Sequence, residues 1–131
     1  MTTVYDALGG LAFFESLVER FYEQVATDPV LRPMYPEDLT GSRTHLALFL
    51  AQYWGGPTTY SDDRGHPRLR SRHMPFVIGE QEAAHWYAHM RDAVNGSEIG
   101  DESLRVQLLD YFASAAQFLI NEPLQGDARG G

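Results

Sequence analysis

Residues 68–76, RLRSRHMPF, place three arginines in alternation before a histidine and then a Met-Pro-Phe sequence. They belong to a stretch from Gly55 to Gly79 that holds Arg64 and His66 as well. The planar side chain of arginine can pair with two oxygens of a carboxylate or a phosphate. The cluster therefore suggests a bound anion, while a solvated arginine-rich loop would have the same composition.

His73 has Arg72 on one side and the apolar residues Met74, Pro75 and Phe76 on the other. An imidazole with such neighbours suits a flat, apolar ligand that carries anionic edges. Haem is a ligand of this kind, because its iron takes an axial histidine and its two propionates attract cations. An ordinary surface histidine is the more frequent case, so the residues alone leave both interpretations open.

Four stretches show the three- and four-residue spacing of apolar positions that is typical of an amphipathic helix. They span residues 11–27, 41–54, 80–94 and 101–121. All seven prolines lie outside these stretches, and DPVLRPMYP, between the first two, has room for one short helical turn. We therefore expect an all-α chain without a strand pair.

The segment from Gly55 to Gly79 is a connector with little helical pattern, and it contains the arginine cluster. Connections between the helices of a bundle usually take about 2–8 residues, and a longer connector in a compact domain is usually functional. The 131 residues of the chain fit one domain. We expect this domain to cover residues 1–124 and residues 125–131 to form a flexible tail.

The chain is acidic, with a net charge of −8, and all ten of its basic residues are arginine. This balance argues against non-specific binding to nucleic acid and against docking to an anionic membrane. The chain has no cysteine, which excludes disulfides and thiolate metal sites. No signal peptide and no membrane-spanning apolar run are visible, so we expect a soluble, cytoplasmic protein.

From about Tyr5 to Pro123 the chain resembles the group II truncated haemoglobins, the bacterial two-over-two globins. The likeness rests on YDALGG, RFYEQVATDPVLRPMYP, FLAQYWGGPTTYS and RGHPRLRSRHMPF, together with Trp86 and Met90. The resemblance implies a globin-like two-over-two helical sandwich, in which the four predicted helices correspond to helices B, E, G and H. It also implies one haem b (iron protoporphyrin IX) with the long connector on its proximal side.

The resemblance further implies roles for particular residues. His73 would be the proximal ligand of the haem iron, and Tyr22, Tyr35 and Trp86 would face a ligand on the distal side. Ser42 falls at the distal gate position, where many globins carry histidine. The other implied pocket residues are Leu46, Phe49, Leu50, Tyr60, Leu69, Phe76, Ile78 and Met90. Residues expected to approach the propionates are Arg72, His45 and His66.

The implied activity is reversible binding of dioxygen, as in oxygen transport, and of small ligands such as CO, NO, cyanide and sulfide. A redox activity at the iron, such as nitric oxide dioxygenation or peroxidase-like chemistry, is the alternative, so enzyme status stays open. The chain has no GxGxxG fingerprint for a flavin or nicotinamide, so a reductase would be a separate protein. A monomer and a homodimer are both compatible with the sequence.

Three other interpretations compete with a haem protein. His85 and His89 are four residues apart and can share a metal, but HWYAH has Trp where a zinc protease needs Glu. No third ligand is evident, so we interpret the pair as a polar flank of a helix. A haem-free helical interaction module would explain the four apolar faces but not the connector. Acid–base catalysis lacks a pair of carboxylates on an apolar face.

Overall fold

The computed structural model describes residues 2–65 and 78–120, and within these ranges the regular structure is entirely helical. The helices are α1 (Val4–Leu8), α2 (Leu11–Val25), η1 (Arg32–Met34), α3 (Thr40–Tyr53), α4 (Thr59–Arg64), α6 (Glu80–Asn95) and α7 (Glu102–Phe118). Among the described residues, no helix has the length and apolar character needed to cross a membrane.

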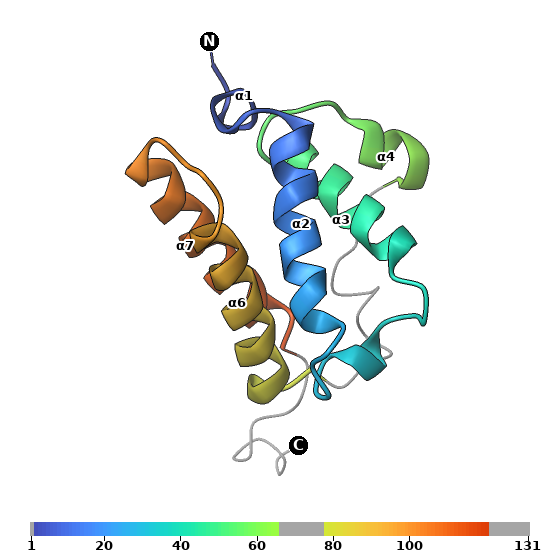
Figure 1. Cartoon of the computed structure of the whole chain (residues 1–131). Coiled ribbons are helices and arrows are strands. Elements are labelled where there is room, and N and C mark those ends of the chain that lie inside the picture. Colours follow the sequence, from blue (N-terminus) through green and yellow to red (C-terminus); the bar gives the residue numbers. More distant parts are fainter. Residues whose placement is uncertain (1, 66–77, 121–131) are drawn as a thin grey trace, which may run out of the picture.

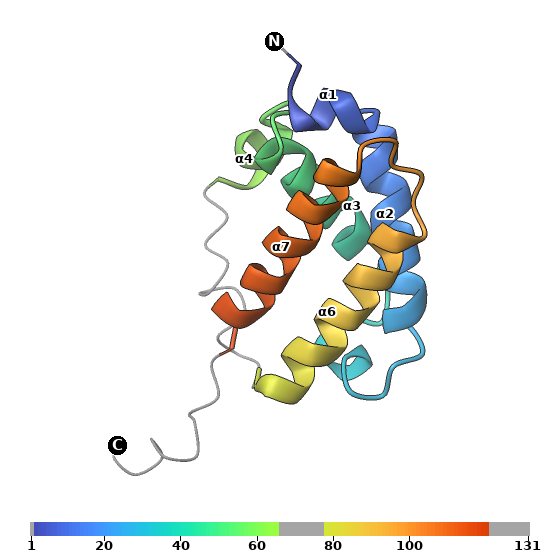
Figure 2. The same cartoon turned by 90° about the vertical axis from the view of Figure 1, so that its left-hand side faces the viewer.

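The four long helices form two packed pairs. Helix α2 packs against α3, and α6 packs against α7, while α2 also lies along α6 and joins the two pairs (Figure 1). The view from the side shows α6 and α7 next to each other in one layer, with α2 and α3 behind them (Figure 2). This arrangement confirms the all-α, two-over-two sandwich expected from the sequence.

The core lies where α2 meets the other pair of helices. Phe14, Leu17, Phe21 and Val25 recur at three- and four-residue spacing along α2 and have no exposed side-chain surface. Burying one such side chain contributes about 1.5–3 kcal/mol relative to leaving it in water. The apolar spacing along residues 11–27 predicted this face correctly, because a stripe at helical period must be covered by a neighbouring element.

Short sequence signals fix where three of the helices begin. Gly9 and Gly10 adopt φ angles of 111° and 79°, which disfavour a side chain, so the double glycine ends α1 and allows α2 to start immediately afterwards. At α6 the backbone N–H of Gly79 donates to Glu82 Oε1 at 2.8 Å. Asp101 caps α7 by accepting from the N–H of Ser103 at 2.9 Å.

The observed helices differ from the predicted ones in a few places. Helices α1 and α4 were not predicted, and α4 lies within the connector that showed little helical pattern. Both are too short to display an apolar period; in α4 only Tyr60 is buried. The short turn expected before the second helix is η1, and α7 ends at Phe118 rather than at residue 121. The expected tail, 125–131, lies outside the described residues.

Side-chain hydrogen bonds fasten α4 to α3. Gln52 Nε2 donates to Ser61 Oγ at 2.7 Å, and the backbone N–H of Ser61 donates to Gln52 Oε1 at 3.0 Å. This reciprocal pair uses both ends of the Gln52 amide. The pair therefore sets the position of the preceding residue, Tyr60. The rings of Tyr60 and Phe49 of α3 pack edge to face, with their centroids 5.4 Å apart.

Candidate functional site

A cavity of about 510 Å³ lies between the two helix pairs. This volume falls within the range of about 300–1,000 Å³ that is typical of small-molecule and cofactor sites. Its walls come from α2, the η1 region, α3, α4, α6 and α7. The lining residues are Tyr22, Met34, Tyr35, Pro36, Ser42, His45, Leu46, Phe49, Leu50, Tyr60, Arg64, Trp86, Tyr111, Phe112, Ala115 and Leu119.

The cavity brings together most of the predicted site residues that the structure describes. Those that line it are Tyr22, Tyr35, Ser42, His45, Leu46, Phe49, Leu50, Tyr60 and Trp86. Met90 is completely buried in the core instead, and Ile78 lines a second, smaller cavity. The other predicted residues lie outside the described ranges; they are His66, Leu69, Arg72, His73 and Phe76.

Helix α3 supplies one wall of the cavity through a single stripe. Ser42, His45, Leu46, Phe49 and Leu50 are spaced by three and four residues, so their side chains share one face of the helix. The stripe is polar at its N-terminal end and apolar farther along. Helix α3 packs on α2, and this stripe faces the cavity that α6 and α7 border from the other side.

Four polar side chains meet at one wall of the cavity, and we call Tyr22, Tyr35, Ser42 and Trp86 the donor cluster. The side chain of Tyr22 pairs with those of Tyr35 and Ser42, and that of Tyr35 also pairs with the Trp86 indole, whose N–H can only donate; the directions of the pKa shifts indicate that Tyr22 donates to Tyr35 and accepts from Ser42. The rings of Tyr22 and Tyr35 are perpendicular, with centroids 5.5 Å apart. A phenol oxygen that accepts two hydrogen bonds keeps its own hydrogen for a third partner.

The two tyrosines of the donor cluster stay neutral. Burial raises the pKa of Tyr22 far above its ordinary value, and the neighbouring Tyr35 adds to this rise. Burial also raises the pKa of Tyr35 to about 12, although the hydrogen bonds from Tyr22 and Trp86 act in the opposite direction. Both phenols therefore keep their protons at physiological pH, and the cluster offers donors without net charge.

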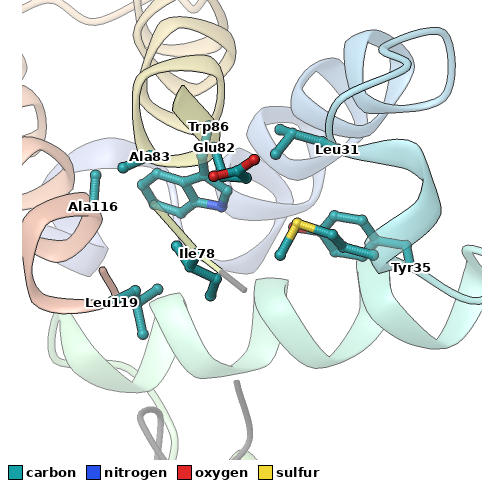
Figure 3. Close-up of a pocket in the computed structure, with 9 residues that line it drawn as sticks. Leu31, Tyr35, Ile78, Glu82, Ala83, Trp86, Ala116 and Leu119 are labelled. Atoms are coloured by element: carbon teal, nitrogen blue, oxygen red, sulfur yellow. The ribbon is translucent and has the colours of Figure 1, made fainter. Parts of the chain in front are cut away.

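A second cavity of about 30 Å³ borders the donor cluster. One water molecule needs roughly 10–15 Å³ of such space, so the cavity has room for about two. Figure 3 shows the Trp86 indole among the lining side chains, with Ile78 and Leu119 on one side of the ring and Tyr35 across from it. Tyr35 and Trp86 line both cavities, so a space of diatomic size adjoins the polar wall of the larger one.

Two nitrogen-bearing side chains, which we call the Arg64–His45 pair, line the same large cavity. Arg64 Nη1 lies 3.1 Å from His45 Nε2, and the Arg64 guanidinium sits over the Tyr60 ring at 5.9 Å from its centroid. His45 was predicted to approach a propionate, whereas Arg64 was noted only as part of the arginine cluster. The alternative of a purely solvated arginine-rich loop does not explain why Arg64 reaches the cavity.

Sequence reasoning missed the wall that α7 supplies. Tyr111, Phe112, Ala115 and Leu119 line the cavity, and all of them belong to the apolar face predicted for residues 101–121. Helical spacing marked them as facing inward. It carries no information on whether such a face meets another helix or a ligand, so only the fold could assign them to the site.

The lining residues fit haem. Leu46, Phe49 and Phe112 provide an apolar slot, while the Arg64 guanidinium and the His45 imidazole offer N–H donors to carboxylate groups at its edge. The donor cluster provides a polar wall against which a small ligand can be held. The residue proposed as the iron ligand, His73, lies outside the described ranges, so the fit rests on the cavity and its other walls.

Comparisons with known proteins agree with this site. The bacterial-like globin family matches residues 3–118. The group 2 truncated haemoglobin YjbI of Bacillus subtilis is 38% identical over 118 residues, covering 90% of this chain and 88% of the relative. The structure of a thermostable haemoglobin from Thermobifida fusca is 51% identical, with a TM-score of 0.89, and the match covers 94% of this chain and 100% of that one.

A further solved structure, of a truncated oxygen-avid haemoglobin from Bacillus subtilis, is 38% identical with a TM-score of 0.83, covering 92% of this chain and 100% of that one. These matches span nearly the whole chain, and they do not favour a haem-free interaction module. They confirm the family inferred from the sequence. The chain belongs to the bacterial-like globins and is a truncated haemoglobin of group II, a haem globin that binds oxygen.

Proposed function

We propose that this protein reversibly binds dioxygen at a five-coordinate haem b whose iron is held by His73. The observation that carries the proposal is the donor cluster, which sets neutral O–H and N–H groups at one wall of an otherwise largely apolar cavity. When bound, haem supplies the iron position at which dioxygen and other small ligands, such as CO, NO, cyanide and sulfide, are taken up.

The donor cluster governs how long a ligand stays. A dioxygen ligand that gains partial negative charge is stabilised by donors already aimed at it. The Tyr35 hydroxyl is the donor left for this task, because its oxygen already accepts from Tyr22 and Trp86. The surrounding apolar walls keep water out and so strengthen this hydrogen bond.

The Arg64–His45 pair positions the cofactor. We propose that His45 and Arg64, together with Arg72 and His66 of the connector, face the propionates, because arginine cations and imidazole N–H donors beside these carboxylates stabilise their charge at the edge of an apolar slot. The Arg64 guanidinium over Tyr60 and the contact with His45 support this role. Leu46, Phe49 and Phe112 would then contact the porphyrin faces.

Absorption spectra of the ferric, ferrous and dioxygen-exposed protein test the proposal, with His73→Ala as the decisive variant. We expect this variant to lose stable haem binding, because no other side chain is assigned to the iron. The matched control is His85→Ala, a histidine of α6 that does not line the cavity, and it should keep the full haem content. Full haem stoichiometry and an unchanged spectrum in His73→Ala would show that another residue holds the iron.

We further propose that a separate reductase keeps the iron ferrous, since the sequence has no flavin or nicotinamide fingerprint. The acidic, cysteine-free composition supports a cytoplasmic location for this protein, where it would meet the reductase. Re-reduction of the ferric protein by a cell extract, with and without added nicotinamide cofactor, tests the reductase. Sedimentation of the haem-loaded protein distinguishes the monomer from the homodimer.

A further inference from the structure

A polar cluster lies on α6 and the end of α2, apart from both cavities, and we call Asp28, His85 and His89 the Asp–His cluster. Asp28 follows α2 and has only 7% of its surface exposed, while the two histidines are one turn apart on α6. Asp28 Oδ2 lies 2.8 Å from His85 Nδ1 and 2.6 Å from His89 Nε2. The three candidate ligand atoms all lie within 4.8 Å of one another.

Gln24 determines which nitrogen of His89 carries a hydrogen. Gln24 Nε2 contacts the carbonyl oxygen of His89 at 3.4 Å, which fixes the amide so that Gln24 Oε1 faces His89 Nδ1 at 3.0 Å. His89 Nδ1 must therefore donate to Gln24. In the neutral imidazole the lone pair then sits on Nε2, and Nε2 points at the Asp28 carboxylate.

Two acceptors at 2.6 Å repel each other unless a cation lies between them. In the neutral form of His89 a metal ion can take this place, and a proton takes it in the charged form. A histidine that binds a metal through one nitrogen usually donates its other N–H to an oxygen, which fixes the ring. Gln24 already provides that oxygen, so His89 is oriented for a metal before one arrives.

The chemistry of the three ligands selects the class of metal. Two imidazole nitrogens and one carboxylate oxygen suit zinc and its neighbours among the transition metals, with water completing four-fold coordination. Bonds of about 2.0–2.1 Å to a tetrahedral ion would separate the ligand atoms by roughly 3.3 Å. Binding would therefore lengthen both contacts of Asp28 Oδ2, now 2.6 Å to His89 and 2.8 Å to His85, and the His85 side chain, which is 39% exposed, has room to turn.

We propose that Asp28, His85 and His89 bind a divalent transition-metal ion of the zinc class, at a site separate from the haem iron. The sequence presented the histidine pair without a third ligand, and the fold supplies it from the turn after α2. Because Asp28 and the histidines come from different elements, a bound ion would tie the end of α2 to α6 and raise the stability of the folded protein.

Isothermal titration of the tag-free, haem-loaded protein with zinc chloride at neutral pH tests the proposal. We expect one site, which is weakened by at least about 10-fold in His85→Ala and lost in His85→Ala/His89→Ala. Asp110→Asn removes an exposed carboxylate from α7 and is the matched control; it should bind zinc as the parent does. Gln24→Leu keeps all three ligands but loses the oxygen that orients His89, so its affinity should fall by about 10–100-fold.

Two further measurements test the metal site even if the double variant folds less well. Zinc should raise the thermal midpoint of the parent and of Asp110→Asn, and at the same zinc concentration it should raise that of His85→Ala by less. Crystals soaked in zinc should give an anomalous peak between Asp28 and His89. Equal zinc affinity in the parent and in a folded double variant, or no binding by the parent up to millimolar zinc, would overturn the proposal.

Discussion

The donor cluster and the Asp–His cluster both join side chains of α6 to residues on α2 or just after it. They differ in the chemistry of the groups that meet. The first meets inside the cavity through neutral hydroxyl and indole groups, whereas the second meets outside it through a carboxylate and two imidazoles. His85 and Trp86 are consecutive residues. They serve different clusters because successive side chains on a helix are rotated by about 100°.

Burial has opposite outcomes in the two places. Tyr22 and Asp28 are both nearly covered, with 4% and 7% of their surface exposed. Burial raises the pKa of the Tyr22 phenol, which stays neutral. Burial also acts to raise the pKa of Asp28, but the hydrogen bonds from His85, His89 and the Val30 N–H outweigh it and hold that pKa well below its usual range. The partners of a buried group, rather than burial alone, decide its charge.

Removing two donors from the cavity should have the largest effect. In Tyr35→Phe/Trp86→Phe we expect dioxygen to dissociate about 10–100-fold faster, since the hydrogen bond from Tyr35 to the ligand and the one from Trp86 that supports Tyr35, about 0.5–1.5 kcal/mol each, are both lost. Stopped-flow measurement of the dissociation rate checks this, with Asp110→Asn as the control. A rate in the double variant that matches the parent would mean that the donor cluster does not contact the ligand.

Asp28→Asn should act on stability instead of ligand release. We expect the free energy of unfolding at neutral pH to fall by about 1–2 kcal/mol, because both histidines lose the charged group that they contact. The effect has a defined pH dependence. The folded pKa of Asp28 is lowered from an unfolded value of about 3.9, so its contribution is complete above about pH 4 and is lost as the pH falls toward the folded pKa.

Urea denaturation of parent and Asp28→Asn from neutral to acidic pH measures this difference. A chelator in every sample removes any contribution of bound metal. The gap between the two proteins should shrink below about pH 4, where the unfolded carboxyl takes up its proton. A gap that stays constant through the acid range would show that Asp28 is not held charged by its histidines.

The two clusters also differ in how much of them the sequence could predict. Helical spacing marked Tyr22 and Trp86 as facing inward, the family resemblance grouped them with Tyr35, and the structure puts all three at one cavity. The same spacing paired His85 with His89 but gave no third ligand. Asp28 lies 57 residues from His85 along the chain. A local sequence pattern therefore cannot predict that the packing of α2 on α6 brings Asp28 next to the two histidines.

Arg64 and the α7 wall show a second limit. The arginine cluster indicated an anion, and the apolar face of residues 101–121 indicated burial, but neither signal named a cavity. Helix α4, which carries Arg64 to His45, is too short to show an apolar period. Residues positioned by long, periodic helices were predictable, whereas those positioned by short elements or by the contact between helix pairs required the fold.

Tyr22→Phe distinguishes the roles within the donor cluster. The Tyr22 hydroxyl donates to Tyr35 and does not need to touch the ligand itself. Its loss should speed dioxygen dissociation by only about 2–10-fold, the equivalent of one hydrogen bond. Stopped flow on Tyr22→Phe beside Tyr35→Phe gives the comparison. If Tyr22→Phe has the larger effect, Tyr22 rather than Tyr35 is the direct donor.

The smallest effect is expected at the exposed edge of the Asp–His cluster. The His85 side chain is 39% exposed and that of His89 is 17% exposed, although both contact the same carboxylate oxygen. Water and salt screen the outer contact more strongly, so His85→Ala should lower the free energy of unfolding by less than about 1 kcal/mol. His89→Ala should lower it further, because it also removes the hydrogen bond to Gln24.

Thermal and urea unfolding of both variants in chelator, at low and high salt, make this ranking measurable. The deficit of His85→Ala should nearly vanish at high salt, and that of His89→Ala should largely persist because its partners are covered. The reverse ranking would place the main support of Asp28 at the exposed histidine. The carboxylate would then owe its charge mainly to the exposed His85, and not to the covered contact with His89.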